Sequence, residues 1–417
     1  MQGRREVTVK LKAISLFTGI GGLDFGFEAA GYETRVALDF DPVACATVRL
    51  NRDWPVLEGS IGEISSELIL KTARLKPGEA DILIGGPPCQ PFSKSGYWAR
   101  GDSRRLSDPR ADTLTEYLRV LRDTRPKAFL LENVPGLAYR GKSEGIEALK
   151  AGVEDINRDL GTSYALEFRA LNSADYGVPQ LRERVFIIGS SEGKRFKFPA
   201  QTHFRPDSEE ALAGGEAHRT TWDALAGLAP VKDNASLRVK GKWADLLPSI
   251  PEGYNYLWHT DRGGGVPLFG WRRRYWNFLL KLAKDKPSWT IQAQPGPATG
   301  PFHWENRRLS AEELCRLQTF PDGLRFECGH ADIQKMVGNA VPSALAETLA
   351  REVAAQFFGV RGVLRPATLI PAVQQTIPNP TRRLPVAKKF LHLVDSDSAH
   401  PGTGLGRGAI FRDSEAA

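Results

Sequence analysis

Short apolar runs separated by helical patterns fill the first 190 residues of the chain. Nearly continuous apolar runs predict strands buried on both faces of a sheet, and they lie at 13–17, 34–38, 81–84, 128–131 and 185–188. Between them, apolar residues three or four positions apart predict helices at 22–30, 42–50, 113–122 and 146–160. Strands that alternate with helices indicate a mostly parallel α/β sheet with right-handed connections.

The pattern changes in the second half of the chain. From about residue 191 to 306 the sequence is rich in Gly, Pro, Trp and Arg and has weak periodicity, which predicts a second, irregular domain. Helical spacing returns at 310–317 and at 342–358. Beyond Gly359 the chain has six prolines and few periodic segments, so we expect a surface extension that is partly disordered.

Composition narrows the class of protein. The 417 residues are 41% hydrophobic and 25% charged, which is typical of a globular chain and excludes overall disorder. No apolar run approaches the roughly 18 residues of a membrane-spanning helix, and the polar, basic start lacks the apolar stretch of a signal peptide. The four cysteines do not form a disulfide framework or a zinc motif, so no metal is expected. The net charge of +7 permits a nucleic-acid partner.

A glycine-rich turn follows the first predicted strand. Gly19, Gly21 and Gly22 would let a ligand approach the backbone at the start of a helix. Asp39 ends the next strand, where an acidic residue can bind ribose hydroxyls. The spacing differs from the GxGxxG that binds a pyrophosphate, so a nucleoside-type cofactor such as S-adenosylmethionine fits better. The alternative is a turn that only connects a strand and a helix.

Cys89 lies just past the strand at 81–84, at the sheet edge where ligands bind in open α/β sheets. Two prolines directly before it stiffen the loop, and a thiolate at this place is a candidate nucleophile. The alternative for a lone cysteine is a small buried hydrophobic residue. We interpret Cys45 and Cys315 in that way, because both lie among apolar residues in predicted helices.

Two more polar clusters lie at strand ends. Glu132 and Asn133 follow the strand at 128–131, where partial desolvation would raise the pKa of a carboxyl enough for it to donate a proton. Arg184 enters the strand at 185–188 and can direct a guanidinium into the same crevice. The alternatives are a helix N-cap for the first cluster and a surface ion pair for the second.

Together these motifs resemble those of the DNA (cytosine-5) methyltransferases, in the family's order along nearly the whole chain. The matching segments are 17–22, 39–41, 87–90, 132–134, 180–184, 308–321 and 334–342. The resemblance implies a Rossmann-like, S-adenosylmethionine-dependent methyltransferase fold with a second, irregular target-recognition domain. It divides the chain into a first catalytic part at 1–190, the recognition domain at 191–306, a hinge at 307–334, a returning catalytic helix at 335–360 and the extension at 361–417.

The resemblance also assigns the residues that hold the cofactor. S-Adenosylmethionine, and its product S-adenosylhomocysteine, are expected at Phe17, Thr18, Gly19, Ile20, Gly21, Gly22, Asp39, Phe40, Ser60, Ile61, Pro88, Leu114, Asn339 and Ala340. Ser60 stands where the family often has Asp, and Asp39 where Glu is commoner. These departures affect the strength of binding and leave the identity of the cofactor unchanged.

The mechanism that the resemblance implies uses Cys89, Glu132, Arg182 and Arg184. The Cys89 thiolate attacks C6 of a cytosine flipped out of the duplex, Glu132 hydrogen-bonds and protonates N3, and Arg184 holds O2. C5 then takes the methyl group. Loss of the C5 proton and expulsion of Cys89 give 5-methylcytosine.

Double-stranded DNA is the expected partner. The predicted contacts are Ser93, Lys94, Arg104 and Arg105 in a basic loop at 93–110, and Arg272, Arg273, Arg274 and Thr290 in the recognition domain. The alternatives are a solvated loop and core positions for Trp271 and Trp276.

Methylation of cytosine in transfer RNA and non-catalytic DNA binding are the competing functions. We expect a monomeric methylase of a restriction–modification system, in the bacterial cytoplasm or nucleoid, with an endonuclease that acts separately.

Overall fold

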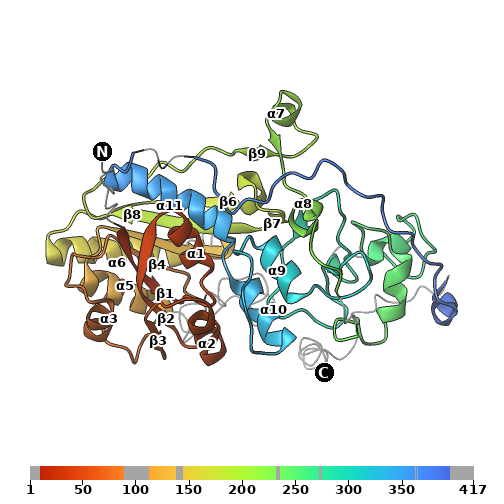
Figure 1. The fold of residues 1–417 in the computed structure, drawn as a ribbon, viewed down its shortest axis with the longest axis horizontal. Helices are drawn as coiled ribbons and strands as arrows, with labels where there is room; N and C mark the ends of the chain where they lie inside the picture. Colours follow the sequence, from red (N-terminus) through yellow and green to blue (C-terminus); the bar gives the residue numbers. More distant parts are fainter. Residues whose placement is uncertain are drawn as a thin grey trace, which may run out of the picture.

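The structure is a computed structural model that describes residues 10–88, 112–137, 144–231, 235–271, 275–361, 363 and 365–394, except for the side chains of residues 112 and 144. Its first lobe is built on a seven-stranded sheet with the strand order β3-β2-β1-β4-β5-β8-β6 (Figure 1). The strands are β1 (Leu11–Leu16), β2 (Tyr32–Asp39), β3 (Val56–Glu58), β4 (Ile82–Gly85), β5 (Ala128–Asn133), β6 (Ala165–Asn172) and β8 (Glu183–Ser190).

Helices cover both faces of this sheet. One face carries α1 (Gly22–Ala29) and α11 (Ser343–Phe358), and the other carries α3 (Ser66–Ala73), α5 (Asp112–Thr124) and α6 (Glu144–Leu160). Each face forms its own apolar cluster with the helices that cover it. Every residue of β4 and β5 is therefore buried, which explains the apolar runs at 82–84 and 128–131. The predicted α/β class is confirmed.

The direction of the strands differs from a purely parallel sheet. β3, β2, β1, β4 and β5 are parallel, but β8 is antiparallel to both of its neighbours, β5 and β6. An apolar run has the same pattern in either direction, so the sequence did not predict this reversal. The sequence pattern also missed β3, β6 and α3. All five predicted strands and the four predicted helices of this lobe are present, with shifts of a few residues at their ends.

The segment 191–306, which includes the second lobe, has only short regular elements. They are β9 (His203–Phe204), α7 (Glu209–Leu212), β10 (Glu216–Ala217), α8 (Thr221–Leu225), η4 (Ala244–Ser249), η5 (Tyr256–His259) and β11 (Ser288–Trp289). Its apolar core includes Leu246, Ile250 and Tyr256, each with no exposed surface. The irregular structure expected for this segment is therefore what the described residues adopt.

Several short elements join the two lobes. β11 pairs in parallel with β7 (Gln180–Leu181), which directly precedes β8. Next along the chain from the second lobe come α9 (Ala311–Leu317) and α10 (His330–Asn339), which lie between the lobes in Figure 1. The first lobe also contains α2 (Pro42–Asn51) and the short turns η2 (Pro135–Leu137) and η3 (Ser173–Tyr176).

The described part of the C-terminal tail crosses from one lobe to the other. It leaves α11, runs along the molecule as the blue trace of Figure 1, and ends in η7 (Lys388–Leu393) at the far end of the second lobe. Residues 365–394, expected to be a surface extension, make hydrogen bonds with both lobes. Residues 395–417 lie outside the described residues.

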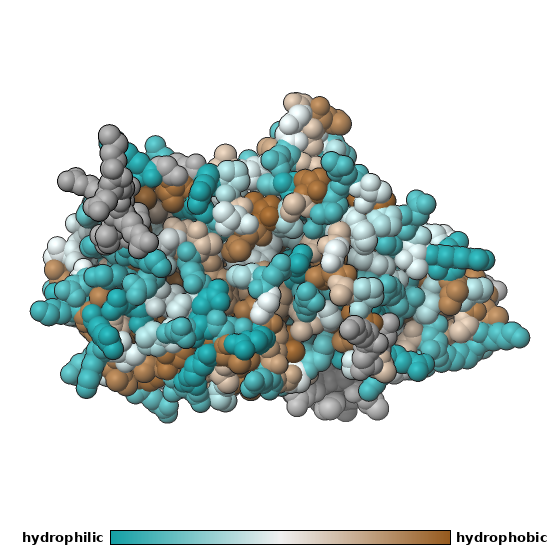
Figure 2. Space-filling view, viewed as in Figure 1, coloured by the Kyte–Doolittle hydropathy of each residue, from teal (hydrophilic) through white to brown (hydrophobic). Residues whose placement is uncertain are grey.

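Polar side chains cover most of the face shown in Figure 2, and apolar residues gather there in separate groups. Within the described ranges, none of the helices has the length and apolar character needed to cross a membrane.

Candidate active site and cofactor cradle

The carboxyl ends of β1 and β2 meet at a turn that is built around Asp39. Gly19 N–H donates to Asp39 Oδ2 at 2.7 Å, and Asp41 N–H donates to Asp39 Oδ1 at 2.9 Å. The turn needs glycine at Gly19, whose φ is +56°, and at Gly21, whose φ is +88°. Burial raises the pKa of Asp39, although the hydrogen bonds from Asp41 and Gly19 oppose that rise. The carboxylate thus sits at the sheet edge beside the glycine turn.

The next two predicted cofactor positions lie on the same edge. Phe40 follows Asp39 directly, and its ring is 64% exposed although it is a large hydrophobic side chain. Ser60 is exposed and Ile61 is buried just after β3, and Gly59 N–H donates to the Asp39 carbonyl at 3.0 Å. The carboxyl ends of β1, β2 and β3 therefore bring these predicted residues together.

The end of α10, in the C-terminal part of the chain, also lies at the predicted cofactor site. A Cβ atom at Gly22 would lie 2.4 Å from the Val341 carbonyl oxygen, so only glycine lets α1 begin this close to residues 340–341. Ser343 Oγ also donates to the Gly22 carbonyl at 3.0 Å. Asn339 and Ala340, predicted on the cofactor, thus lie beside the glycine turn although more than 300 residues separate them from it.

These residues fit a nucleoside cofactor. A Cβ atom added at Gly19 would meet no atom within 4 Å, so there is open space next to the turn. Asp39 offers carboxylate oxygens for ribose hydroxyls, and the exposed ring of Phe40 offers a face for an adenine. Of the other predicted cofactor residues, Pro88 is exposed after β4, and Leu114 is half-buried on α5.

Glu132, the predicted acid, and Arg184, predicted to hold O2 of the base, form an ion pair. Glu132, near the end of β5, pairs with Arg184 at the start of β8, with 3.0 Å between Oε1 and Nε. Antiparallel pairing of β5 with β8 brings the two residues together across 52 positions of sequence. Their side chains are 11% and 17% exposed, so both charges are largely removed from water.

The loop that leads to Cys89 begins against this pair. A Cβ atom at Gly86 would lie 2.9 Å from Glu132 Oε2, and Asn133 Nδ2 donates to the Pro87 carbonyl at 3.4 Å. Glu132 and Asn133 therefore both lie beside the segment that precedes the predicted nucleophile. Cys89 itself lies outside the described residues.

Burial shifts the pKa values of this pair in opposite directions. It raises the pKa of the Glu132 carboxyl, and the charges of Arg184 and Arg182 oppose that rise. Burial lowers the pKa of Arg184, and Glu132 opposes that change. A carboxyl with a raised pKa, next to a guanidinium, can exchange a proton with a bound base while the guanidinium stabilises negative charge.

The identity of the chain follows from comparison with known proteins. The family model described as C-5 cytosine-specific DNA methylase matches residues 11–355. The chain belongs to this family. It is a DNA (cytosine-5)-methyltransferase.

Relatives agree with this assignment, and a solved structure agrees with the fold. The Type II methyltransferase M.SacI of Streptomyces achromogenes is 41% identical over 385 residues, which cover 86% of this chain and 97% of that protein. M.NgoFVII of Neisseria gonorrhoeae is 32% identical over 82% of this chain and 86% of its own length. The crystal structure of the S. pombe Dnmt2 methyltransferase has a TM-score of 0.55 at 16% identity, covering 82% of this chain and 98% of that one, and supports the fold alone.

Arg182 of the methyltransferase lies deeper than the Glu132–Arg184 pair. It is 1% exposed, and its Nη2 donates to the Gly338 carbonyl at 3.0 Å. This bond connects the segment between β7 and β8 with the end of α10. Among the described residues, its Nε and Nη1 have no hydrogen-bond partner. Arg182 thus lies between the Glu132–Arg184 pair and the end of α10, and its catalytic role stays a prediction.

A buried amide pair, which the sequence pattern did not predict, joins three parts of the methyltransferase. Gln180 and Gln318 have no exposed surface, and Gln180 Nε2 donates to Gln318 Oε1 at 3.1 Å. Gln180 Oε1 accepts from Ile291 N–H at 3.0 Å, and Gln318 Nε2 donates to the Val337 carbonyl at 2.7 Å. The pair therefore connects β7, the second lobe and α10. The one sequence signal was the motif of Gln180, Arg182 and Arg184, which are spaced two residues apart.

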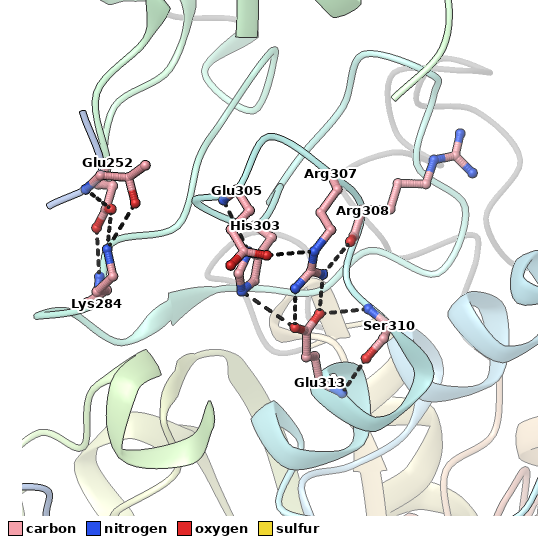
Figure 3. Close-up of polar contacts among 9 residues, drawn as sticks. Glu252, Lys284, His303, Glu305, Arg307, Arg308, Ser310 and Glu313 are labelled. Carbon is pink, nitrogen blue, oxygen red and sulfur yellow. Dashed lines mark hydrogen bonds and ion pairs between the residues drawn. The ribbon is translucent and has the colours of Figure 1, made fainter. Parts of the chain in front are cut away.

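A second buried network fixes the segment between the lobes. Arg307 forms two bonds of 2.7 Å with Glu313, which also accepts from Ser310 N–H at 2.8 Å in a capping box (Figure 3). Burial raises the pKa of Glu313, but Arg307 and His303 outweigh this and lower it overall. Burial lowers the pKa of His303 to about 4. Figure 3 shows Arg308 pointing away from this network.

The predicted DNA contacts are only partly described. Thr290 Oγ1 donates to the Leu181 carbonyl at 2.7 Å, beside the paired strands β7 and β11. Trp271 and Trp276 are 40% and 38% exposed, so the alternative that they occupy core positions is wrong. Trp276 pairs with Trp289 at 5.0 Å between ring centroids, and Trp289 is also 40% exposed.

The remaining predicted contacts, Ser93, Lys94, Arg104, Arg105, Arg272, Arg273 and Arg274, lie outside the described residues. Cys45 and Cys315 are buried at 1% and 6% exposure, which confirms their interpretation as core residues.

Proposed function

We propose that this methyltransferase modifies a cytosine flipped out of a specific duplex DNA sequence and takes the methyl group from S-adenosylmethionine. The open turn at Gly19, the carboxylate of Asp39 and the exposed ring of Phe40 support this cofactor. Bound there, S-adenosylmethionine supplies an electrophilic methyl group. We expect Ser60 and Asn339, both exposed, to contact the cofactor as well.

The proposed chemistry belongs to three side chains. The Cys89 thiolate adds to C6, which converts the unreactive C5 into an enamine-like carbon. Glu132 hydrogen-bonds and protonates N3, so negative charge does not accumulate on the ring. Arg184 keeps the Glu132 carboxyl in place and faces O2. After methylation, a base removes the C5 proton and the C6–S bond breaks, which releases 5-methylcytosine and the thiolate.

The observation that carries this proposal is the buried pair of Glu132 and Arg184, which lies against Gly86 on the loop to Cys89. The test is bisulfite sequencing of duplex DNA incubated with the protein and S-adenosylmethionine, with a parallel labelled-methyl assay on transfer RNA. Methylation of one cytosine in every copy of a short DNA sequence is the expected result. Methyl transfer to transfer RNA alone would contradict the choice of substrate.

We also propose that the protein is the methylase of a restriction–modification system in a bacterial cytoplasm, acting as a monomer beside a separate endonuclease. The relatives M.SacI and M.NgoFVII, both named Type II methyltransferases, support this role. The expected pattern is complete modification of one short sequence, which would protect DNA from an endonuclease of the same specificity. Scattered, partial methylation without a common sequence would argue against this role.

A further inference from the structure

The tail after α11 connects the two lobes over a long path. We call residues 365–394 the strap. The helix α11 ends at Phe358 and is followed by Gly359, whose φ is +66°, and residues 365–387 form no helix or strand before η7. The strap contains Pro366, Pro371, Pro378, Pro380 and Pro385, and proline-rich segments of this kind behave as semi-rigid spacers. The strap lies beyond residue 355, where the match to the family model ends.

The strap begins at a buried ion pair on α11. Glu347 has no exposed surface and pairs with Arg351 at 2.5 Å. Its carboxylate accepts from Thr368 N–H at 2.8 Å, Thr368 Oγ1 at 2.9 Å and Leu369 N–H at 3.0 Å. A buried carboxylate needs several donors, and three of those that Glu347 uses come from the strap. The first lobe therefore holds the strap at a defined point.

The middle of the strap binds α8 at the near side of the second lobe. Gln374 N–H donates to Asp223 Oδ1 at 2.7 Å. Asp223 is also the acidic member of the capping box that begins α8. Trp222 Nε1 donates to the Thr376 carbonyl at 3.0 Å. The Asp223 carboxylate therefore both caps α8 and binds the strap.

A second ion pair holds the strap further along. Thr381 N–H donates to Glu252 Oε1 at 2.6 Å, and Lys284 Nζ donates to Thr381 Oγ1 at 3.2 Å. Glu252 and Lys284 pair with each other at 2.5 Å, with side chains 5% and 8% exposed (Figure 3). Leu384 N–H then donates to the Pro248 carbonyl at 2.9 Å.

The strap ends inside the core of the second lobe. Phe390 is only 3% exposed and stacks on Trp243, with 5.5 Å between ring centroids and 16° between ring planes. It belongs to the same apolar cluster as Leu246 and Tyr256. A residue about 40 positions beyond the middle of α11 thus completes the core of the other lobe.

We propose that the strap is a positioning element that holds the second lobe at the angle at which it meets the DNA, with Thr368 and Phe390 as its terminal anchors. This inference rests on the proposed function, because it assigns DNA recognition to the second lobe. A lobe held in its binding orientation loses less freedom when DNA binds, so the strap should increase affinity for DNA. It touches none of the predicted cofactor residues in the described contacts, so it should leave binding of S-adenosylmethionine unchanged.

The test lengthens the strap while keeping all its anchors. Six Gly and Ser residues are inserted between Ile377 and Pro378 in the full chain, and the matched control carries the same insertion after Gly78, an exposed turn of the first lobe. The strap insertion should weaken binding of a duplex that contains the unmethylated target sequence by about tenfold or more. The Kd for S-adenosylmethionine and kcat at saturating DNA should stay within about twofold of the control.

A second variant separates positioning from folding. Phe390→Ala should weaken DNA binding in the same way, and Phe390→Tyr, which keeps the ring on Trp243, should restore most of it. Small-angle X-ray scattering should show a broader spread of molecular dimensions for the strap insertion than for the control. Equal DNA affinity of the two insertion variants would overturn the proposal, as would a loss of S-adenosylmethionine binding that accompanies every loss of DNA binding. Failure of the proposed function differs from both, since the unaltered chain would then transfer no methyl group.

Discussion

Replacing Glu132 by Gln tests the role of the buried pair. The substitution keeps the size of the side chain and an oxygen that can accept from Arg184 Nε, but it removes the negative charge and the transferable proton. The neighbouring Glu183→Gln is the matched control, because Glu183 is exposed and makes no side-chain bond to Arg184 among the described contacts.

Two magnitudes follow from the structure. Arg184 is only 17% exposed on its side chain, so losing its charged partner should cost about 1.5–3 kcal/mol of folding stability. The chemical step should slow by roughly 10²- to 10⁴-fold, which is the usual contribution of a positioned acid or base. The loss of rate should therefore exceed what the loss of stability explains.

The assay is single-turnover transfer of labelled methyl groups to duplex DNA across a range of pH. Burial raises the pKa of Glu132, so its protonated form persists to higher pH than for an exposed carboxyl. The rate should fall as pH rises through that pKa, and this fall should disappear in Glu132→Gln. A Glu132→Gln enzyme with the rate and pH profile of Glu183→Gln would refute the assignment.

Three further variants test other parts of the account. Gly22→Ala would place a Cβ 2.4 Å from the Val341 carbonyl and should weaken S-adenosylmethionine binding by roughly 1–3 kcal/mol in calorimetric titration, whereas Gly62→Ala, with no atom closer than 4.0 Å, should not; equal affinities would contradict the close approach. Burial raises the pKa of Asp24 from 3.8 to about 7, so between these pH values the folded state holds a proton that the unfolded state releases. The free energy of unfolding should therefore fall as the pH rises from about 4 to 7, by at most ~1.4 kcal/mol per pH unit. Asp24→Asn should flatten that slope in urea unfolding, and an unchanged slope would reject the assignment. Gln180→Leu should lower the free energy of unfolding by roughly 1–3 kcal/mol for each polar group that it leaves unpaired, and a loss below about 0.5 kcal/mol would show that the amide pair contributes little.

The sequence predicted most of the first lobe because its central strands are buried on both faces. β4 and the first four residues of β5 are apolar, and such runs indicate buried strands. β6 was missed because it is an edge strand whose pattern mixes exposed and half-buried residues, including Phe168 at 41% exposure. The direction of β8 depends on which neighbour it meets, and periodicity carries no information about that.

In the candidate site, the sequence predicted the residues, and the structure was needed for the contacts between them. Asp39, Glu132 and Arg184 were each predicted from their places at strand ends, where side chains converge. Their contacts depend on pairing across the sheet, so the bond between Glu132 and Arg184 and the approach of Gly22 to Val341 needed the structure. The strap was beyond sequence analysis because its anchors are single residues, such as Phe390, in a proline-rich segment without periodicity.

The central claim is that Cys89 forms a covalent bond to the target base. A duplex carrying 5-fluorocytosine at the modified position tests it most directly, since fluorine cannot leave as a cation in place of the C5 proton and the adduct cannot break down. Incubation with S-adenosylmethionine, digestion and mass spectrometry should find the nucleotide attached to the peptide that contains Cys89. No adduct, or an adduct on any other residue, would contradict the account.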